Sequence, residues 1–209
     1  MPIVAFVGIP GGGASTLTKE LSKSHLSSGF WLSEEVERSQ TFSFPDDNYA
    51  FGLRTWLRLL RVKQLYEAQK LSQSGQVVFV DGYYDKLMHF YLGYPGTSWI
   101  MKPDNLYFKA TKEIAAVDYQ MLPNADVIIG LRLSFDTWIC FLKGRGRSLD
   151  LNIDFQKECF YAQECFLNAA KQYCCDFNKT YIEIEQQVGK LTQNVTDIKA
   201  KLGELGFHF

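Results

Sequence analysis

The sequence lacks a strong charge of either sign. Its 22 Lys and Arg residues nearly balance 23 Asp and Glu residues among 209, which gives a formal net charge of -1. This balance argues against a protein whose main work is electrostatic binding to nucleic acid or to an anionic membrane. The sequence also lacks an apolar run of the roughly 18–20 residues that a membrane-spanning helix needs. We therefore expect neither nucleic acid nor membrane as a partner.

Secretion signals and cysteine frameworks are lacking as well. The first seven residues carry no basic stretch and lead directly into glycines, so they do not form a signal peptide. The five cysteines are odd in number and lack the spacing of metal ligands, which favours reduced thiols in a cytoplasmic protein. No repeat or Pro/Ser-rich linker divides the chain. Residues 1–209 are therefore expected to form one domain.

What the sequence does contain is an alternation of short apolar runs with longer helical patterns. This alternation predicts an α/β fold, with a parallel sheet of about five strands covered by helices on both faces. Strands buried on both faces are nearly all apolar, as these runs are. The predicted strands are Ile3–Val7, 29–32, Val77–Val80, Val127–Leu133 and 181–184, and the predicted helices are 15–26, 49–73, 109–122, 135–143, 155–173 and 187–205.

A glycine-rich segment between the first predicted strand and the first predicted helix is the strongest local motif. Gly8 and Gly13 have the spacing of the phosphate-binding pattern G-x-x-x-x-G-K-[ST], and Ser15 stands where the Mg²⁺-binding hydroxyl belongs. Glycines let backbone N–H groups close around phosphate, and the following helix N-terminus adds positive potential. The predicted binding segment is Gly8, Ile9, Pro10, Gly11, Gly12, Gly13, Ala14, Ser15 and Thr16.

The lysine of this pattern is replaced by Ala14. The missing cation is one that stabilises charge at the β- and γ-phosphates, so catalysis should suffer more than binding through the backbone. Two origins stay open: the alanine is natural to this chain, or it is a substitution made to trap a complex.

Two adjacent segments carry a resemblance to a known family. Residues 119–132 read YQMLPNADVIIGLR, and residues 134–147 read SFDTWICFLKGRGR. They resemble the deoxyribonucleoside kinase family, in which a Y-x-x-L-P-x-P-D-x-x-I-Y-L strand precedes a helix that ends in an R-G-R lid. Residues 49–69 and 75–84 are similar to the family's long helix and to the strand that carries its Asp/Glu-Arg-Ser triplet. The resemblance extends to about residue 185.

The resemblance implies roles for individual residues. Glu34 matches the family glutamate that takes the proton from the substrate 5′-hydroxyl; Glu35 is its rival, and a solvated acidic helix start is the alternative. Asp81 would hold Mg²⁺ with Ser15 and contact substrate, unless it caps the next helix. Arg145 and Arg147, in a lid near residues 144–150, would close over the phosphates, unless they form a plain basic turn.

The resemblance also implies a nucleoside pocket, and here the sequence departs from the family. Phe51 and Trp56 on the long helix are the expected pocket residues, but Gly52 stands where the family has a base-reading glutamine. The family's triplet appears here as Val80-Asp81-Gly82, so its arginine is missing or displaced. After the lid, Asp150 is the candidate to replace the family's substrate-binding glutamates.

The leading interpretation is therefore an ATP- and Mg²⁺-dependent kinase that phosphorylates the 5′-hydroxyl of a nucleoside or deoxynucleoside. The family implies a homodimer formed through the helix at 49–73. Two alternatives stay open: a nucleotide-binding pseudokinase with a regulatory role, and a P-loop kinase of another small-molecule alcohol.

Overall fold

A computed structural model of the chain describes residues 1–24, 26–31, 46–146, 150 and 152–207. The described residues form a five-stranded sheet in the order β2-β3-β1-β4-β5, and all four strand pairs are parallel. The sequence prediction of a parallel α/β sheet is confirmed. The strands are β1 (Ile3–Val7), β2 (Ser27–Phe30), β3 (Val77–Val80), β4 (Val127–Leu133) and β5 (Thr180–Gln186).

The central strand β1 determines where the site lies. Its Val4 pairs with Phe79 of β3 on one side and with Val127 of β4 on the other. Every residue of β1 is buried, because helices cover both faces of the sheet. The carboxyl ends of β1, β3 and β4 therefore meet at one edge, where open parallel sheets bind their ligands.

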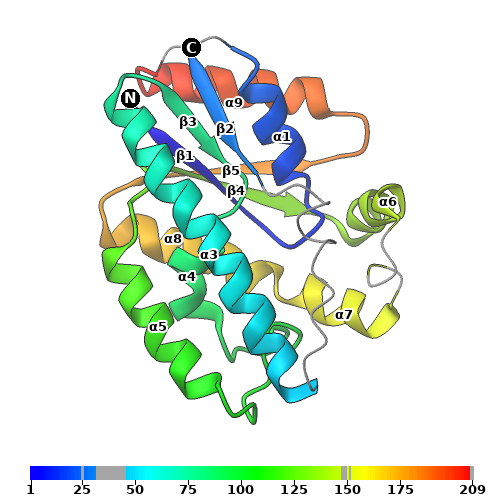
Figure 1. Cartoon of the computed structure of the whole chain (residues 1–209). Helices are drawn as coiled ribbons and strands as arrows, with labels where there is room; N and C mark the ends of the chain where they lie inside the picture. The colour runs from blue at the N-terminus through cyan, green and yellow to red at the C-terminus, as the bar shows by residue number, and fades with distance from the viewer. Residues whose placement is uncertain (25, 32–45, 147–149, 151, 208–209) are drawn as a thin grey trace.

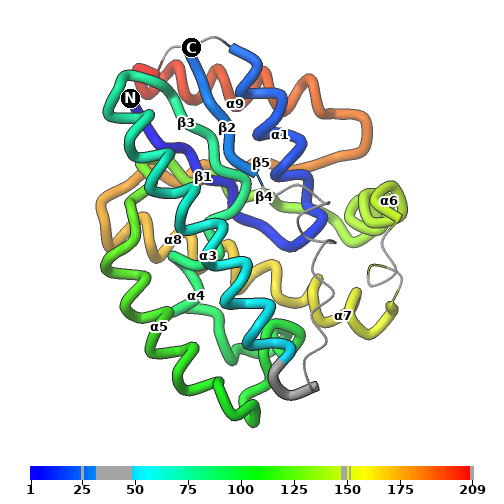
Figure 2. Tube along the Cα trace, viewed as in Figure 1, coloured from blue at the N-terminus to red at the C-terminus, as the bar shows by residue number. Residues whose placement is uncertain are grey.

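Helices cover both faces, as expected (Figure 1). Helices α1 and α9 lie together on one face, over an apolar cluster that includes Phe6 and Phe79. A larger group packs on the other face, and α6 lies beyond the carboxyl end of β4, with α7 between α6 and α8 (Figure 2). The bounds are α1 (Ala14–Leu21), α3 (Asp46–Gln73), α4 (Tyr84–Tyr91), α5 (Phe108–Met121), α6 (Phe135–Arg145), α7 (Ile153–Tyr161), α8 (Gln163–Asp176) and α9 (Leu191–Glu204).

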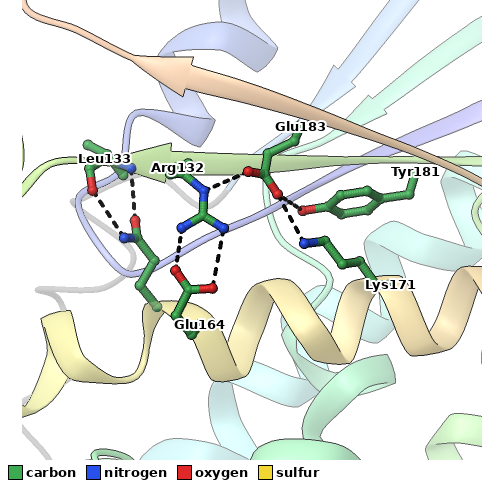
Figure 3. Close-up of polar contacts among 7 residues, drawn as sticks. Arg132, Leu133, Glu164, Lys171, Tyr181 and Glu183 are labelled. Atoms are coloured by element: carbon green, nitrogen blue, oxygen red, sulfur yellow. Dashed lines mark hydrogen bonds and ion pairs between the residues drawn. The ribbon is translucent and has the colours of Figure 1, made fainter.

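A network of polar side chains ties β4 and β5 to α8 (Figure 3). Arg132 bonds both oxygens of Glu164, and its Nε donates to Glu183 Oε1 at 2.6 Å. Glu183 also accepts a hydrogen bond from the Tyr181 hydroxyl at 2.9 Å and forms an ion pair with Lys171 at 3.4 Å. The hydrogen bond from Arg132 holds the pKa of Glu183 at about 2.

Several predicted boundaries of helices and strands were wrong. Helix α1 ends at Leu21, five residues early, where the Ser27 hydroxyl donates to the Leu21 carbonyl; β2 accordingly begins two residues before its prediction. The single helix predicted over 155–173 is divided at Ala162. There the Gln163 side chain bonds both the N–H and the C=O of Leu133, which fixes the start of α8 to the end of β4.

Two further differences concern helices. Helix α4 was not predicted, because its eight residues are too few to show a clear apolar period. The last helix begins at Leu191 instead of residue 187, after Gly189 takes a left-handed φ of 76°. In the described residues, no helix has the length and apolar character that crossing a membrane requires.

Candidate functional site

The glycine-rich loop connects β1 to α1 at the carboxyl edge of the sheet. Gly11 and Gly13 have φ angles of 82° and 90°, in the left-handed region that side-chain-bearing residues rarely adopt. Gly13 is also the N-cap of α1, so the loop ends on the N–H groups at the start of a helix. Such groups have no partner within the helix and attract anions.

Three successive carbonyls of the loop are held by hydrogen bonds. The Tyr84 hydroxyl of α4 donates to the Gly8 carbonyl at 3.2 Å, and the Gly12 N–H donates to the Ile9 carbonyl at 3.0 Å. Trp138 of α6 donates its indole N–H to the Pro10 carbonyl at 2.8 Å. Helices on two sides of the loop therefore hold its shape.

Ser15 and Asp81 lie together, as the sequence predicted for a shared metal site. The Ser15 hydroxyl donates to Asp81 Oδ2 at 2.7 Å, although 66 residues separate them. Asp81 follows β3, the neighbour of the strand that precedes the loop. The alternative role of Asp81 as a helix cap is not observed, because α4 has Tyr83 at its N-cap and no side-chain cap bond.

This oxygen pair fits Mg²⁺. Magnesium is usually held by one or two protein oxygens together with phosphate oxygens and waters, and a hydroxyl beside a carboxylate at the phosphate loop supplies that donor set. The described residues contain no cluster of three or more His, Cys, Asp or Glu side chains that would hold a metal unaided. Ser15 and Asp81 would thus need further oxygen ligands, such as phosphate oxygens or waters, to complete the coordination.

Arg145 provides a positive charge beside the loop. A Cβ atom added to Gly11 would lie 3.1 Å from Arg145 Nη1, so the guanidinium packs directly against the loop backbone. This nitrogen is buried and finds no hydrogen-bond partner among the described residues. Asp150 is also buried and forms an ion pair with Arg145 Nε at 3.7 Å. Ala14 begins α1 and packs against the apolar cluster beneath that helix.

The predicted pocket residues of α3 are partly brought together. Phe51 stacks on Tyr107 with ring centroids 4.3 Å apart and lines a cavity between α3, α4 and α5. Trp56 is half-buried on the same helix and does not belong to the described lining of that cavity. Glu34, its rival Glu35, and Arg147 lie outside the described residues.

Sequence reasoning missed the charged residues of this region. Arg61 of α3 bonds Asp85 of α4 through Nε at 2.6 Å, with both side chains largely buried. Burial pulls the pKa of Arg61 down, but the Asp85 carboxylate outweighs burial and the net shift is upward. The Arg61 guanidinium also lies over the Tyr84 ring at 5.6 Å. Burial raises the pKa of Tyr84, which keeps its hydroxyl protonated against the loop.

Together, the sheet order, the glycine loop after the central strand and the Ser15–Asp81 pair define a P-loop kinase fold. Solved structures of deoxyadenosine kinase from M. mycoides share this fold. The structure with bound dATP has a TM-score of 0.69 and 20% identity, over 97% of this chain and 100% of that one. The structure with the products dCMP and a flexible dCDP has a TM-score of 0.65 and 21% identity, over 97% and 99%.

A third structure of the same enzyme, with bound dCTP, has a TM-score of 0.56 and 18% identity, over 97% of this chain and 99% of that one. These matches confirm the fold of the deoxynucleoside kinases along nearly the whole chain. No protein-family model and no curated protein sequence matches the chain.

Proposed function

We propose that the chain is a kinase that transfers the γ-phosphoryl group of ATP to the 5′-hydroxyl of a nucleoside or deoxynucleoside. The observation that carries the proposal is the Ser15–Asp81 hydrogen bond of 2.7 Å at the foot of the glycine loop. This hydrogen bond joins a loop that suits phosphate to a carboxylate that follows β3, the strand paired with β1. The fold is shared with deoxyadenosine kinases.

The residues have distinct roles in this proposal. Gly8–Thr16 binds the donor phosphates, and Arg145 and Arg147 neutralise charge on the transferring group. Glu34 accepts the proton of the acceptor hydroxyl. Mg²⁺, when bound, neutralises phosphate charge, and Ser15 and Asp81 would hold it. Phe51, Trp56 and Asp150 are the proposed acceptor contacts.

A panel of nucleosides assayed with ATP and Mg²⁺ tests the proposal, using the wild-type chain beside the Ala14→Lys variant. The lysine should raise kcat by on the order of 10², because its charge matters most as charge moves toward the leaving group. If the lysine variant binds ATP tightly and phosphorylates no nucleoside, the nucleoside assignment fails.

Glu34 and Glu35 are distinguished in the Ala14→Lys background. Glu34→Gln should abolish most turnover and leave ATP binding intact, whereas Glu35→Gln should change little. The opposite pattern would assign the base to Glu35. Equal, modest losses from both variants would mean that neither residue is the base.

Ala14 supports a second candidate, a nucleotide-binding protein that has lost phosphoryl transfer. Without the lysine, the loop retains its backbone N–H groups and the neighbouring Arg145, which suffices for binding but weakens catalysis. ATP binding without turnover by either form of the chain favours this candidate. Turnover of other alcohols alone favours a kinase of a different small molecule.

We further propose a cytoplasmic homodimer formed through α3 together with α5. Both helices expose apolar side chains, and Arg58 of α3 bonds Asp118 of α5 between them. Light scattering at micromolar concentrations should report twice the monomer mass. The exposed residues are Tyr49, Leu59 and Tyr66 on α3 and Ile114, Val117 and Met121 on α5.

A further inference from the structure

Three arginines lie on one face of α3. Arg54, Arg58 and Arg61 are spaced by four and three residues, which places them on the same side of a helix. All three approach the described parts of α4, α5 or the segment between them. Guanidinium groups that are withdrawn from water, as Arg61 is and Arg54 is in part, are unfavourable unless each charge is compensated.

Two of these arginines are compensated by carboxylates. Arg58 donates from two nitrogens to the two oxygens of Asp118, each at 2.6 Å. Arg61 bonds the two oxygens of Asp85 at 2.6 and 3.4 Å. Both contacts are the two-pronged geometry in which a guanidinium binds a carboxylate best. Each pair is electrically neutral.

Arg54 is different. Within the described parts of the chain it forms no ion pair: its Nε donates to the Ile100 carbonyl at 3.4 Å, and its guanidinium lies 5.7 Å from the Trp99 ring centre. The nearby carboxylate, Asp85, is already held by Arg61. This cluster therefore contains two guanidinium groups and one carboxylate.

Physical chemistry makes this imbalance unfavourable for the empty protein. Burial, followed by repulsion from Arg61, lowers the pKa of Arg54 to about 10. Arg54 is half-buried, and its one described hydrogen-bond acceptor is the Ile100 carbonyl, so most of the five N–H donors of its guanidinium remain available to a ligand. Arg54 also lines the cavity between α3, α4 and α5, together with Phe51, Thr55 and Asp85.

Contacts connect this cavity to the phosphate loop. The Tyr84 hydroxyl donates a hydrogen bond to the Gly8 carbonyl, and the Arg61 guanidinium lies over the Tyr84 ring. Arg61 in turn bonds Asp85, which lines the cavity. The loop would bind the phosphate donor in the proposed function. In the proposed function, the end of the acceptor that is remote from the reacting hydroxyl would therefore extend from the loop toward this cavity.

We propose that Arg54 binds an anionic group of the acceptor, a carboxylate or a phosphate carried away from the hydroxyl that is phosphorylated. The inference rests on the proposed function and specifies its substrate class. A planar guanidinium matches either anion through two parallel hydrogen bonds, and the anion restores the charge balance with Asp85 and Arg61. A neutral nucleoside supplies acceptor atoms but no charge.

Calorimetric binding of matched ligands tests the proposal without any turnover. Uridine is compared with orotidine and 5-carboxyuridine, which add a base carboxylate, and with uridine 3′-monophosphate; all four retain the 5′-hydroxyl. At least one anionic ligand should bind tenfold or more tightly than uridine, and Arg54→Gln should remove that preference. Lys63→Gln removes one exposed charge from the same helix and should leave the preference intact.

The carboxylated and phosphorylated ligands distinguish the two anions. The proposal is overturned if no anionic ligand exceeds uridine by threefold, or if Lys63→Gln reduces the preference as much as Arg54→Gln does. It is also overturned if deoxyguanosine, whose neutral oxo edge suits arginine, binds more tightly than every anionic ligand.

Thermal unfolding of the ligand-free protein gives an independent readout. Arg54→Gln should raise Tm by about 2–4 °C, because it removes an uncompensated charge. An unchanged or lower Tm would show that Arg54 is a structural cation and would overturn the proposal. ADP binding separates this inference from the proposed function: if ADP binds and nucleosides are phosphorylated without an anion preference, only the role of Arg54 falls.

Discussion

Two clusters of charged side chains in this molecule contrast in their charge balance. On β4, β5 and α8, Arg132 and Lys171 face Glu164 and Glu183, two cations with two carboxylates (Figure 3). Among the described side chains of α3 and α4, Arg61 pairs with the carboxylate of Asp85, and Arg54 lies nearby without an ion pair. The first cluster is neutral, and the second has an excess positive charge.

Burial makes this contrast informative. The Arg132 and Glu183 side chains are 33% and 32% exposed, so water would tolerate an imbalance there. The Arg61 and Asp85 side chains are 11% and 3% exposed, where an imbalance is costly. Arg54, which carries the excess charge, is half-buried beside this pair, so its charge is less well hydrated than one at the surface and is available to a ligand.

The largest expected effect comes from breaking the buried pair. Arg61→Met should lower the free energy of unfolding by about 3–5 kcal/mol, because it leaves the Asp85 carboxylate buried without its partner. Urea denaturation measures the change.

The control replaces both partners. In the double variant Arg61→Met, Asp85→Leu, most of the lost stability should return, since no charge is left buried. If the double variant is as unstable as the single one, packing around Arg61 is responsible, and the electrostatic contrast with the β4–β5 network is lost.

Lys86 extends the comparison to a cation compensated without a carboxylate. Its fully buried ammonium donates to the Leu122 carbonyl at 2.6 Å, just past the carboxyl end of α5, and lies over the Phe177 ring at 4.9 Å. Burial nevertheless lowers its pKa to about 8. Between about pH 8 and 10.5 the unfolded chain then binds more protons than the folded one, so this group makes stability rise with pH.

Lys86→Met should remove that contribution. We compare the free energy of unfolding of the variant with that of the wild type. The difference in favour of the variant should be larger at pH 7.5 than at pH 10.5 by on the order of 2–3 kcal/mol, which corresponds to a shift of about two pKa units. Denaturation at both pH values gives the result, and the tyrosines and cysteines that titrate there are common to both proteins. If the difference in the free energy of unfolding between the two proteins does not change with pH, the lowered pKa of Lys86 is contradicted.

The smallest effect is expected in the neutral network. Arg132→Met should cost about 1 kcal/mol near pH 6, because its partners are partly hydrated. The pKa of Glu183 is depressed to about 2, so the stability that Arg132 provides is complete above about pH 4.5 and is lost as the pH falls toward 2. Wild type and variant should therefore converge in acid denaturation. Equal losses at pH 6 and pH 2.5 would assign the effect to packing.

The sequence was a good guide wherever a regular pattern carries the information. The bounds of β1, β3 and β4 were predicted correctly, because strands buried on both faces are continuous apolar runs. The glycine loop followed from its motif spacing, and the pairing of Ser15 with Asp81 followed from the family resemblance together with strands that end at one edge.

The missed features depend on contacts between distant segments. No local sequence pattern indicates that Arg61 bonds Asp85, or that a helix is divided where Gln163 bonds Leu133. A signal for the charged side of the cavity was present in the sequence as arginines at positions 54, 58 and 61, which share one face of a helix. Which of the three lacks a carboxylate became evident only once α4 and α5 were placed against α3.

Hydrogen bonds hold three carbonyls of the glycine loop, those of Gly8, Ile9 and Pro10, and this order bears on what the loop loses by having Ala14 in place of lysine. The Tyr84 hydroxyl of α4 and the Trp138 indole N–H of α6 hold the Gly8 and Pro10 carbonyls in place without a ligand. A loop already ordered loses little conformational entropy when a ligand arrives, which preserves affinity where a flexible loop would forfeit it. In the proposed function, a loop fixed in this way would keep much of its affinity for phosphate without the lysine, whose absence would mainly lower the rate of phosphoryl transfer.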